Sequence, residues 1–243
     1  MDIAAKNGRK HTGGTVLRKL CALLLSALLL VVFAGCEPTD ATPATQQDRG
    51  MQGLVIVVDA GHGGMDKGAR SASGVREDQL NLAVAKYLEQ ELAAAGVTVV
   101  MTRTGDGVDY SGEGSTKKQK DMDSRAKLIR GSAAAAVISI HMNKYPQAQY
   151  RGAQTFYWND SAEGQKMSKS IQDALIAGLP GGNTRQIKPG DYFILHVTDA
   201  PAALVECGFL SNAQEERSLQ DPAYQQQVAK CIAQGVIAYF QSR

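Results

Sequence analysis

Short apolar runs alternate with amphipathic stretches along the chain from Gly53 onward. The short runs are rich in Val, Ile and Ala. They predict buried strands, because a strand covered on both faces is apolar along its whole length. These runs occupy residues 54–58, 97–102, 136–140, 154–158 and 202–205, and a further extended piece is predicted at 192–195.

The stretches between the runs have the periodicity of helices. Leu80, Val84, Leu88 and Leu92 recur at helical spacing, and Gly96 follows as a stop signal. Further helices are predicted at residues 124–130, 162–177 and 224–240, and a polar, glycine-rich loop at 104–120. Strands that alternate with helices indicate the α/β class, with a single domain built on a mostly parallel sheet that helices cover on both faces.

Residues 1–36 are predicted to be an export leader. Arg18 and Lys19 precede a charge-free, leucine-rich run at residues 20–34. This run of roughly 15 residues is shorter than the about 20 of a membrane-spanning helix, and it suits the core of a signal peptide. It ends at Phe33-Ala34-Gly35-Cys36, which is similar to the lipobox of bacterial lipoproteins and makes Cys36 the expected lipidation site. A simple membrane anchor and a conventionally cleaved signal are the alternatives, and each of them exports the rest of the chain.

Residues 37–52 are rich in Thr, Pro and Gln and contain few large apolar side chains. A segment of this composition cannot bury enough apolar surface to offset the loss of chain entropy on folding, so a disordered linker is predicted. The catalytic domain is then expected to cover residues 53–243.

The charge distribution argues against nucleic acid as a partner. Residues 1–36 hold five basic side chains and one acidic one; without them Lys plus Arg falls from 26 to 21 and Asp plus Glu from 24 to 23. The remainder is close to −2 and has no basic block of the kind that follows phosphates. Beyond the leader, Cys207 and Cys231 lack Cys-x-x-Cys spacing, so we expect two small buried side chains and neither a thiolate metal site nor a disulfide.

Polar residues stand at the ends of three predicted strands. His62 follows the first strand within a glycine-rich turn, His141 ends the strand at 136–140, and Glu206 interrupts an apolar run. Ligand sites of open parallel sheets form beyond the carboxyl ends of the strands, so these side chains are expected to converge. Glu77 precedes the helix that starts near Asp78, and with the two histidines it provides two imidazoles and a carboxylate, a donor set that suits a catalytic zinc ion.

Each of these features also has a structural explanation when taken alone. A histidine at a strand end is often a hydrogen-bonded structural residue, and a glutamate in the first turn of a helix is favoured by the helix dipole. A glycine-rich turn after a strand can hold a phosphate, but no Gly-Lys-Ser/Thr follows here, which disfavours a nucleotide loop.

Five motifs, in order, resemble those of the zinc-dependent N-acetylmuramoyl-L-alanine amidases, and the resemblance runs from about Leu54 to Phe240. The motifs are residues 57–64 (VVDAGHGG), Glu77 followed by Asn81-Leu82-Ala83, residues 101–103 (MTR), residues 138–143 (ISIHMN) and residues 201–212 (PAALVECGFLSN). The resemblance implies a twisted sheet of about six strands flanked by helices. It also implies one Zn²⁺ per chain, held by His62, Glu77 and His141, with Glu206 as the catalytic carboxylate.

The same resemblance implies hydrolysis of the amide bond between N-acetylmuramic acid and L-alanine in peptidoglycan. Arg103 and Asn143 are expected to order the site or to contact substrate, and His196 to hydrogen-bond substrate or to cap a loop. Residues 152–157 and 189–195 are most similar to the sporulation and germination type of the family, which matures spore cortex. An exported, membrane-anchored monomer is expected. Another zinc peptidase acting on wall peptides and a non-catalytic wall-binding regulator are the alternative functions.

Overall fold

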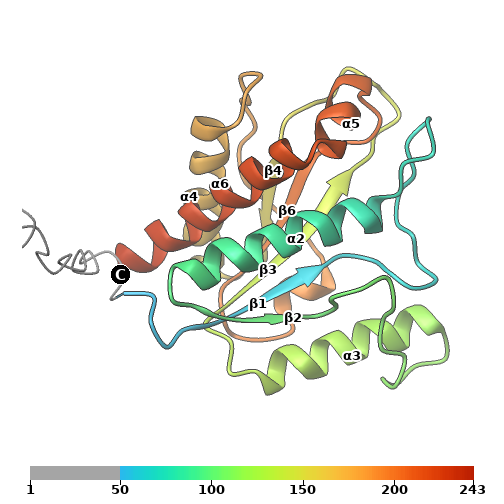
Figure 1. Cartoon of the computed structure of the whole chain (residues 1–243). Coiled ribbons are helices and arrows are strands. Elements are labelled where there is room, and N and C mark those ends of the chain that lie inside the picture. Colours follow the sequence, from blue (N-terminus) through green and yellow to red (C-terminus); the bar gives the residue numbers. More distant parts are fainter. Residues whose placement is uncertain (1–49) are drawn as a thin grey trace, which may run out of the picture. The chain divides into compact units, whose positions relative to one another are not determined.

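The computed structural model describes residues 50–243, and it contains one mixed sheet with helices on both faces (Figure 1). The sheet is built from strands β1 (Val55–Ala60), β2 (Thr98–Met101), β3 (Ala136–Asn143), β4 (Gln154–Tyr157), β5 (Lys188–Pro189) and β6 (Ala202–Phe209). The helices are α2 (Glu77–Ala94), α3 (Lys117–Gly131), α4 (Ala162–Gly178), α5 (Ala213–Gln220), α6 (Pro222–Gln241) and the 3₁₀-helix η1 (Phe193–His196). The predicted α/β class and six-stranded, mostly parallel sheet are confirmed.

The strand order is β2-β1-β3-β6-β4-β5. Strands β2, β1, β3 and β6 run parallel to one another, whereas β4 is antiparallel to β6 and β5 is parallel to β4. The carboxyl ends of β1, β3 and β6 therefore lie side by side at one edge of the sheet. Three of the candidate residues come from this edge.

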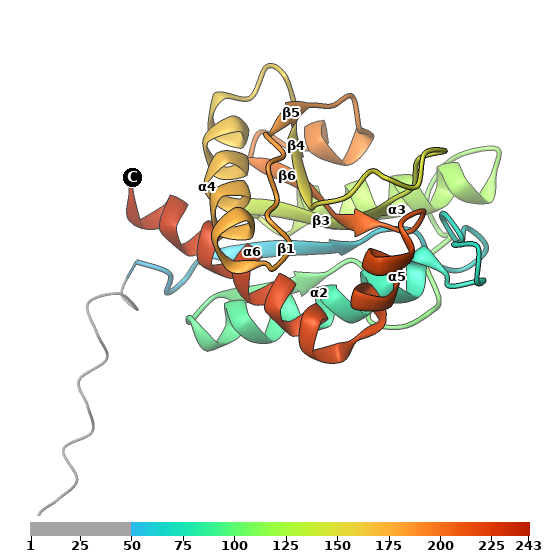
Figure 2. The same ribbon diagram turned by 90° about the horizontal axis from the view of Figure 1, so that it is seen from above.

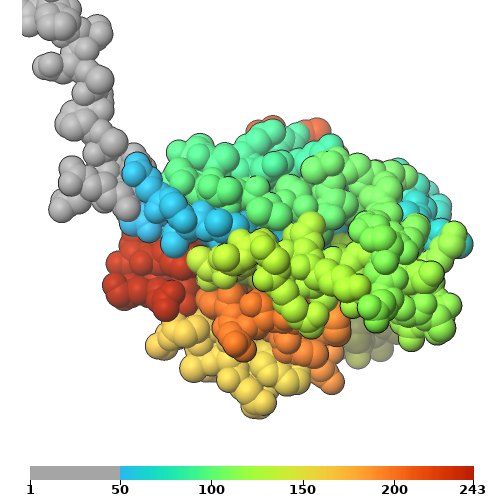
Figure 3. Space-filling view, turned by 90° about the horizontal axis from the view of Figure 1, so that it is seen from below, coloured from blue at the N-terminus to red at the C-terminus, as the bar shows by residue number. Residues whose placement is uncertain are grey.

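Successive side chains of each strand point to opposite faces of the sheet, and the two faces have separate hydrophobic cores. On one face Ile56 and Val58 of β1 and Val205 of β6 pack against α2, α4 and α6. On the other, Val57 and Leu204 pack against α3 and η1. The view from above shows the sheet between α3 on one side and α2 with α6 on the other (Figure 2), and Figure 3 looks onto the face with α3 in yellow-green and the segment around η1 in orange.

This alternation decides where polar side chains can lie. Asp59, Ser139, His141 and Glu206 are each an even number of residues from Val57, Val137 or Leu204, so they share the face of α3 and η1. This face has the smaller of the two core clusters. Polar groups and a pocket are accommodated there without interrupting the main core under α2, α4 and α6.

Several boundaries differ from those expected from the sequence. Helix α3 begins at Lys117, within the predicted loop, and helix α5 at Ala213–Gln220 was not predicted. The extended piece predicted at 192–195 is wrong, because Phe193–His196 forms a 3₁₀-helix whose Ile194 and Leu195 pack on the sheet. A single turn of helix buries two consecutive apolar residues on one surface, which a strand cannot do because its neighbouring side chains point to opposite faces.

The leader at 1–36 and most of the linker predicted at 37–52 lie outside the described residues. Met51, near the end of the predicted linker, is fully buried in the core, so the folded part begins at least two residues before Gly53. Cys207 and Cys231 are free and buried, as predicted. Within residues 50–243, no helix combines the length and the apolar character that crossing a membrane requires.

Candidate active site

The glycine-rich turn after β1 brings His62 over the edge of the sheet. His62 has φ of 59°, a left-handed conformation that few residues other than glycine adopt. The preceding Gly61 leaves room for a neighbour, since a Cβ there would stand 2.3 Å from Cε1 and Nε2 of His141. The ring of His141 therefore packs directly on the turn, and the centroids of the two imidazoles lie 4.9 Å apart. The turn thus fixes both histidines with respect to each other.

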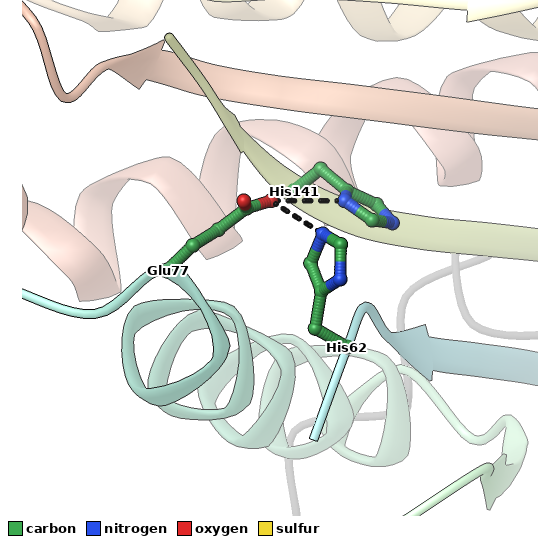
Figure 4. Close-up of side chains that lie close together, drawn as sticks. All are labelled: His62, Glu77 and His141. Atoms are coloured by element: carbon green, nitrogen blue, oxygen red, sulfur yellow. Dashed lines mark hydrogen bonds and ion pairs between the residues drawn. The ribbon is translucent and has the colours of Figure 1, made fainter. Parts of the chain in front are cut away.

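Glu77, the first residue of α2, joins the two histidines (Figure 4). Its Oε1 lies 3.2 Å from His62 Nε2 and 3.0 Å from His141 Nδ1. Its Oε2 accepts a hydrogen bond from the backbone N–H of Ala69 at 2.6 Å. One donor atom from each of His62, Glu77 and His141 lies within 4.8 Å of the others. The structure therefore brings the three predicted ligands together from the end of β1, the start of α2 and the end of β3.

These groups polarise one another strongly. Burial opposes the charge of His62, but the carboxylates of Glu77 and Asp66 more than offset this and raise its pKa to about 9. Burial likewise opposes the charge of Glu77, and hydrogen bonds to His141 and His62 nevertheless hold its pKa far below the usual range. The site therefore concentrates negative charge between two imidazoles, as a cation-binding site requires.

Asp66 is a site residue that the sequence reasoning did not identify. Its Oδ2 lies 3.1 Å from Nδ1 of His62, the ring nitrogen opposite the one that faces Glu77. Histidine ligands of metals commonly donate their second N–H to a carboxylate, which fixes the tautomer and the orientation of the ring. The available signal was an acid four residues after a candidate ligand, within the same glycine-rich turn.

Glu206 lines the same pocket from the neighbouring strand, where it is the register partner of His141. Its Oε2 is buried and has no hydrogen-bond partner among the described residues. Burial raises the pKa of Glu206 to about 7, helped by the nearby Glu77 carboxylate and opposed by His141 and His62. A carboxyl group with this pKa exchanges protons readily near neutral pH.

Two buried arginines hold the turn from below. Arg103 donates hydrogen bonds to the carbonyl oxygens of Ala60, Gly61 and Asp78, at 2.8 to 2.9 Å. Arg125 donates to Asp59 Oδ1 at 2.7 Å and to the carbonyl oxygen of His62 at 2.6 Å. Arg103 is buried and does not line the pocket.

The other two candidates occupy different positions. Asn143 ends β3 and lines the pocket two residues beyond His141. His196 ends η1, where its ring lies against Trp158 with centroids 4.6 Å apart, and it is absent from the pocket wall. Asn143 is therefore within the site, and His196 is outside it.

The pocket has a volume of about 540 Å³ and lies between α3, η1 and the edge of the sheet. Two imidazole nitrogens and a carboxylate oxygen form a donor set that fits a divalent metal ion, and nitrogen and oxygen donors in this combination suit zinc. The partnerless Oε2 of Glu206, which lines the same cavity, fits a group that handles a proton beside such an ion.

Comparison with known proteins agrees with this geometry. Residues 56–238 match the family model described as N-acetylmuramoyl-L-alanine amidase. The chain is 41% identical, over 196 residues, to the germination-specific N-acetylmuramoyl-L-alanine amidase of Bacillus subtilis, covering 78% of this chain and 81% of that protein.

Solved structures give the same result. The CwlD amidase of Clostridioides difficile, determined in complex with the GerS lipoprotein, matches with a TM-score of 0.75 at 35% identity, covering 78% of this chain and all of the other. An N-acetylmuramoyl-L-alanine amidase of Clostridium difficile 630 matches with a TM-score of 0.70 at 31% identity, covering 78% and 98%. Sequence, fold and site agree, and the chain belongs to the N-acetylmuramoyl-L-alanine amidase family.

Proposed function

We propose that this protein is a zinc-dependent amidase that hydrolyses the bond between the lactyl group of N-acetylmuramic acid and L-alanine in peptidoglycan. The observation that carries the proposal is the cluster of His62, Glu77 and His141 with Glu206 facing the same cavity. One zinc ion per chain would be held by the first three residues. When bound, the ion would supply Lewis-acid chemistry, polarising the amide carbonyl and acidifying water.

The chain's own residues would move the proton. Glu206 takes a proton from the hydrolytic water and returns it to the amine nitrogen of L-alanine as the C–N bond breaks. Its raised pKa, to about 7, supports both halves of this transfer. Asp66 holds the ring of His62 from behind, and Arg103 and Arg125 hold the turn that carries it.

Replacing Glu206 by Gln tests this assignment. The amide keeps the shape of the side chain but cannot accept the proton, so hydrolysis of purified peptidoglycan should fall by at least roughly a hundredfold while one zinc per chain is retained. Activity is read as new L-alanine amino termini and zinc content by elemental analysis. Wild-type hydrolysis of peptide bonds within the stem would indicate a peptidase, and zinc-loaded wild type that binds wall without releasing peptide would indicate a regulator.

We further propose that the protein acts outside the cytoplasm, anchored through its N-terminal leader and acylated at Cys36. The basic, leucine-rich segment that ends at Cys36 supports this proposal. The similarity to a germination-specific amidase supports a role in spore cortex, and we expect the enzyme to act as a monomer. Mass spectrometry of the mature N-terminus tests the lipid, and light scattering tests the oligomeric state.

A further inference from the structure

A second cavity of about 400 Å³ adjoins the candidate active site and shares Asn143 and Tyr192 with it. We call it the aromatic–basic groove; its walls include Tyr145, Tyr150, Tyr192, Phe209, Arg185 and Lys188. Three of these aromatic side chains, Tyr145, Tyr150 and Tyr192, are among the exposed large hydrophobic residues. The groove therefore presents apolar faces and cations together, directly beside the position of the proposed chemistry.

The charges of the aromatic–basic groove are of one sign. Arg185 and Lys188 line it, and no acidic side chain does. By contrast, the active-site pocket is lined by charges of both signs, with carboxylates such as Asp66, Glu77 and Glu206 beside Lys118, Arg125 and Lys144. An anionic part of a substrate would be attracted into the groove, where no carboxylate opposes the two cations.

Both cations have N–H donors that bind no acceptor within the described part of the protein. The guanidinium of Arg185 lies over the ring of Phe209, 4.4 Å from its centroid, and donates through Nε to the carbonyl oxygen of Arg151 and through Nη1 to Gln154 Oε1. Among residues 50–243, neither Nη2 of Arg185 nor Nζ of Lys188 has a hydrogen-bond or ion-pair partner within the protein. Arg185 is thus held in place while its Nη2 group stays available, and such a guanidinium is suited to bind a carboxylate.

The register of the sheet gives the lateral distance between Lys188 and the strand that carries Glu206. Gln154 of β4 pairs with Glu206 of β6, and Lys188 of β5 pairs with Phe156 of β4. Neighbouring strands are about 4.8 Å apart, so the backbone of Lys188 is about 10 Å from the strand that carries Glu206. An extended peptide advances about 3.4 Å per residue and covers this distance in about three residues.

We propose that the aromatic–basic groove binds the stem peptide of the substrate and recognises its free carboxylates through Arg185 and Lys188. This inference rests on the proposed function, since it identifies which side of the scissile amide enters the groove. The N-acetylated sugars of the glycan are uncharged, whereas stem peptides carry free carboxyl groups within the first residues after L-alanine. Charge complementarity therefore assigns the groove to the peptide and not to the glycan.

The test compares two substrates with the zinc-loaded full chain. Uncrosslinked glycan strands with tripeptide stems are used with their carboxyl groups free, or after conversion of these groups into primary amides with carbodiimide and ammonia. The measured quantity is the ratio of kcat/KM on free strands to kcat/KM on amidated strands. We expect a ratio of about ten or more for the wild type, because charge-assisted hydrogen bonds are lost on amidation.

Lys188→Met is the informative variant, since Lys188 is exposed and its Nζ has no hydrogen-bond or ion-pair partner among residues 50–243. It should lower the ratio about fivefold, the magnitude of one exposed ion pair, and Lys188→Arg should restore it. Lys86→Met, on the exposed side of α2, is the matched control and should leave the ratio unchanged. Arg185 is less suitable because its substitution also removes its bonds to Arg151 and Gln154.

Each outcome separates this proposal from the proposed function. A wild-type ratio near one, or a ratio that Lys188→Met leaves unchanged, would overturn the peptide assignment while amidase activity stands. An equal loss on both substrates in Lys188→Met would place the uncharged glycan in the groove and would also overturn it. Absence of new L-alanine amino termini from both substrates would instead refute the amidase function.

Discussion

Asp59 carries a buried charge beneath the site, and its neighbours determine whether that charge is tolerated. Its carboxylate accepts hydrogen bonds from Arg125 at 2.7 Å, Ser139 at 2.6 Å and Thr102 at 2.8 Å. Burial opposes the charge, but these donors more than offset it and lower the pKa of Asp59 to about 2. The ionised carboxylate thus stabilises the folded state and ties β1, β2, β3 and α3 together under the candidate ligands.

Loss of this charge should be visible in the pH dependence of stability. Because the pKa of Asp59 is lower in the folded chain than its ordinary value of 3.8, its contribution is present above about pH 4 and is lost as the pH falls toward 2. Asp59→Asn should therefore lower the free energy of unfolding by about 3 kcal/mol at pH 7, since Arg125 loses a buried partner.

Urea unfolding between pH 3 and pH 7 measures the difference between wild type and Asp59→Asn. The difference should narrow below about pH 4, where Asp59 becomes protonated in the unfolded chain while it stays ionised in the folded one. Asp173→Asn, an exposed partner of Lys169, is the control and should change little at any pH. If the difference in the free energy of unfolding stayed constant down to pH 3, the ionised carboxylate of Asp59 would not be its cause.

The site also depends on Gly68, because the absence of a side chain there leaves room for Glu77 and His62. Its φ is +62°, and a Cβ there would lie 2.5 Å from Glu77 Oε2 and 2.6 Å from His62 Cδ2. Gly68→Ala should displace two of the proposed ligands and weaken zinc binding by at least roughly tenfold, within the range for changes next to metal ligands. Isothermal titration of the metal-free protein with zinc measures the affinity.

Gly74 provides the matched control for Gly68. It also has a positive φ, of +95°, but no atom lies within 4 Å of a Cβ built there. Both alanine variants should lose about 1 kcal/mol of stability to the strained backbone, and Gly68→Ala alone should lose zinc affinity. Equal zinc affinities in the two variants would show that contact of a Cβ with Glu77 and His62 does not weaken zinc binding.

At the level of elements, α3 supports the site through its first half. Asp121 and Arg125 lie on its buried side, and Nη2 of Arg125 reaches the carbonyl oxygen of His62. The helix begins with a capping box, in which Thr116 Oγ1 accepts from the backbone N–H of Gln119 and the Gln119 side chain accepts from the backbone N–H of Thr116. This cap holds the turns that present Asp121 and Arg125.

Thr116→Ala should remove the cap and lower the free energy of unfolding by about 1 kcal/mol. Thr116→Ser keeps the oxygen and should restore most of that loss. Chemical denaturation of the two variants beside the wild type measures the difference. If Ser and Ala at this position were equally destabilising, the methyl group and not the cap would be responsible.

The elements also show how far the sequence can predict this structure. Apolar runs located the core strands because those signals are local in the sequence. Two strand ends with Glu77 likewise gave the candidate ligands, and a third gave Glu206. The start of α3 was misplaced by seven residues, since a polar, lysine-rich first turn has no apolar periodicity, although Thr116 and Gln119 formed a detectable capping box. Asp66, four residues after His62, left a local signal that was not used. The aromatic–basic groove, by contrast, depends on contacts between distant segments, which no local pattern encodes.

At the level of the whole molecule, the proposed metal ligands come from separate elements that only the folded sheet brings together. Oε1 of Glu77 lies between the two imidazoles, and the pKa of His62 is raised to about 9. A histidine must be neutral to bind a metal, so zinc has to displace a proton from His62 at every pH below that value. Folding therefore preorganises the donors, but protons compete with the metal for them.

Zinc binding should accordingly release a proton and strengthen as the pH rises. Since His62 is protonated below about pH 9 in the metal-free chain, its contribution lowers the apparent zinc affinity by up to about tenfold per pH unit between pH 8 and pH 6. Titration calorimetry in two buffers of different ionisation enthalpy counts the released protons, and about one is expected from His62 at pH 7. Asp66→Asn removes one of the two carboxylates that raise this pKa, so it should shift the pH dependence toward acid. An affinity that is flat across this range, with no buffer dependence of the binding heat, would mean that His62 is already neutral and that Glu77 and Asp66 do not control its charge.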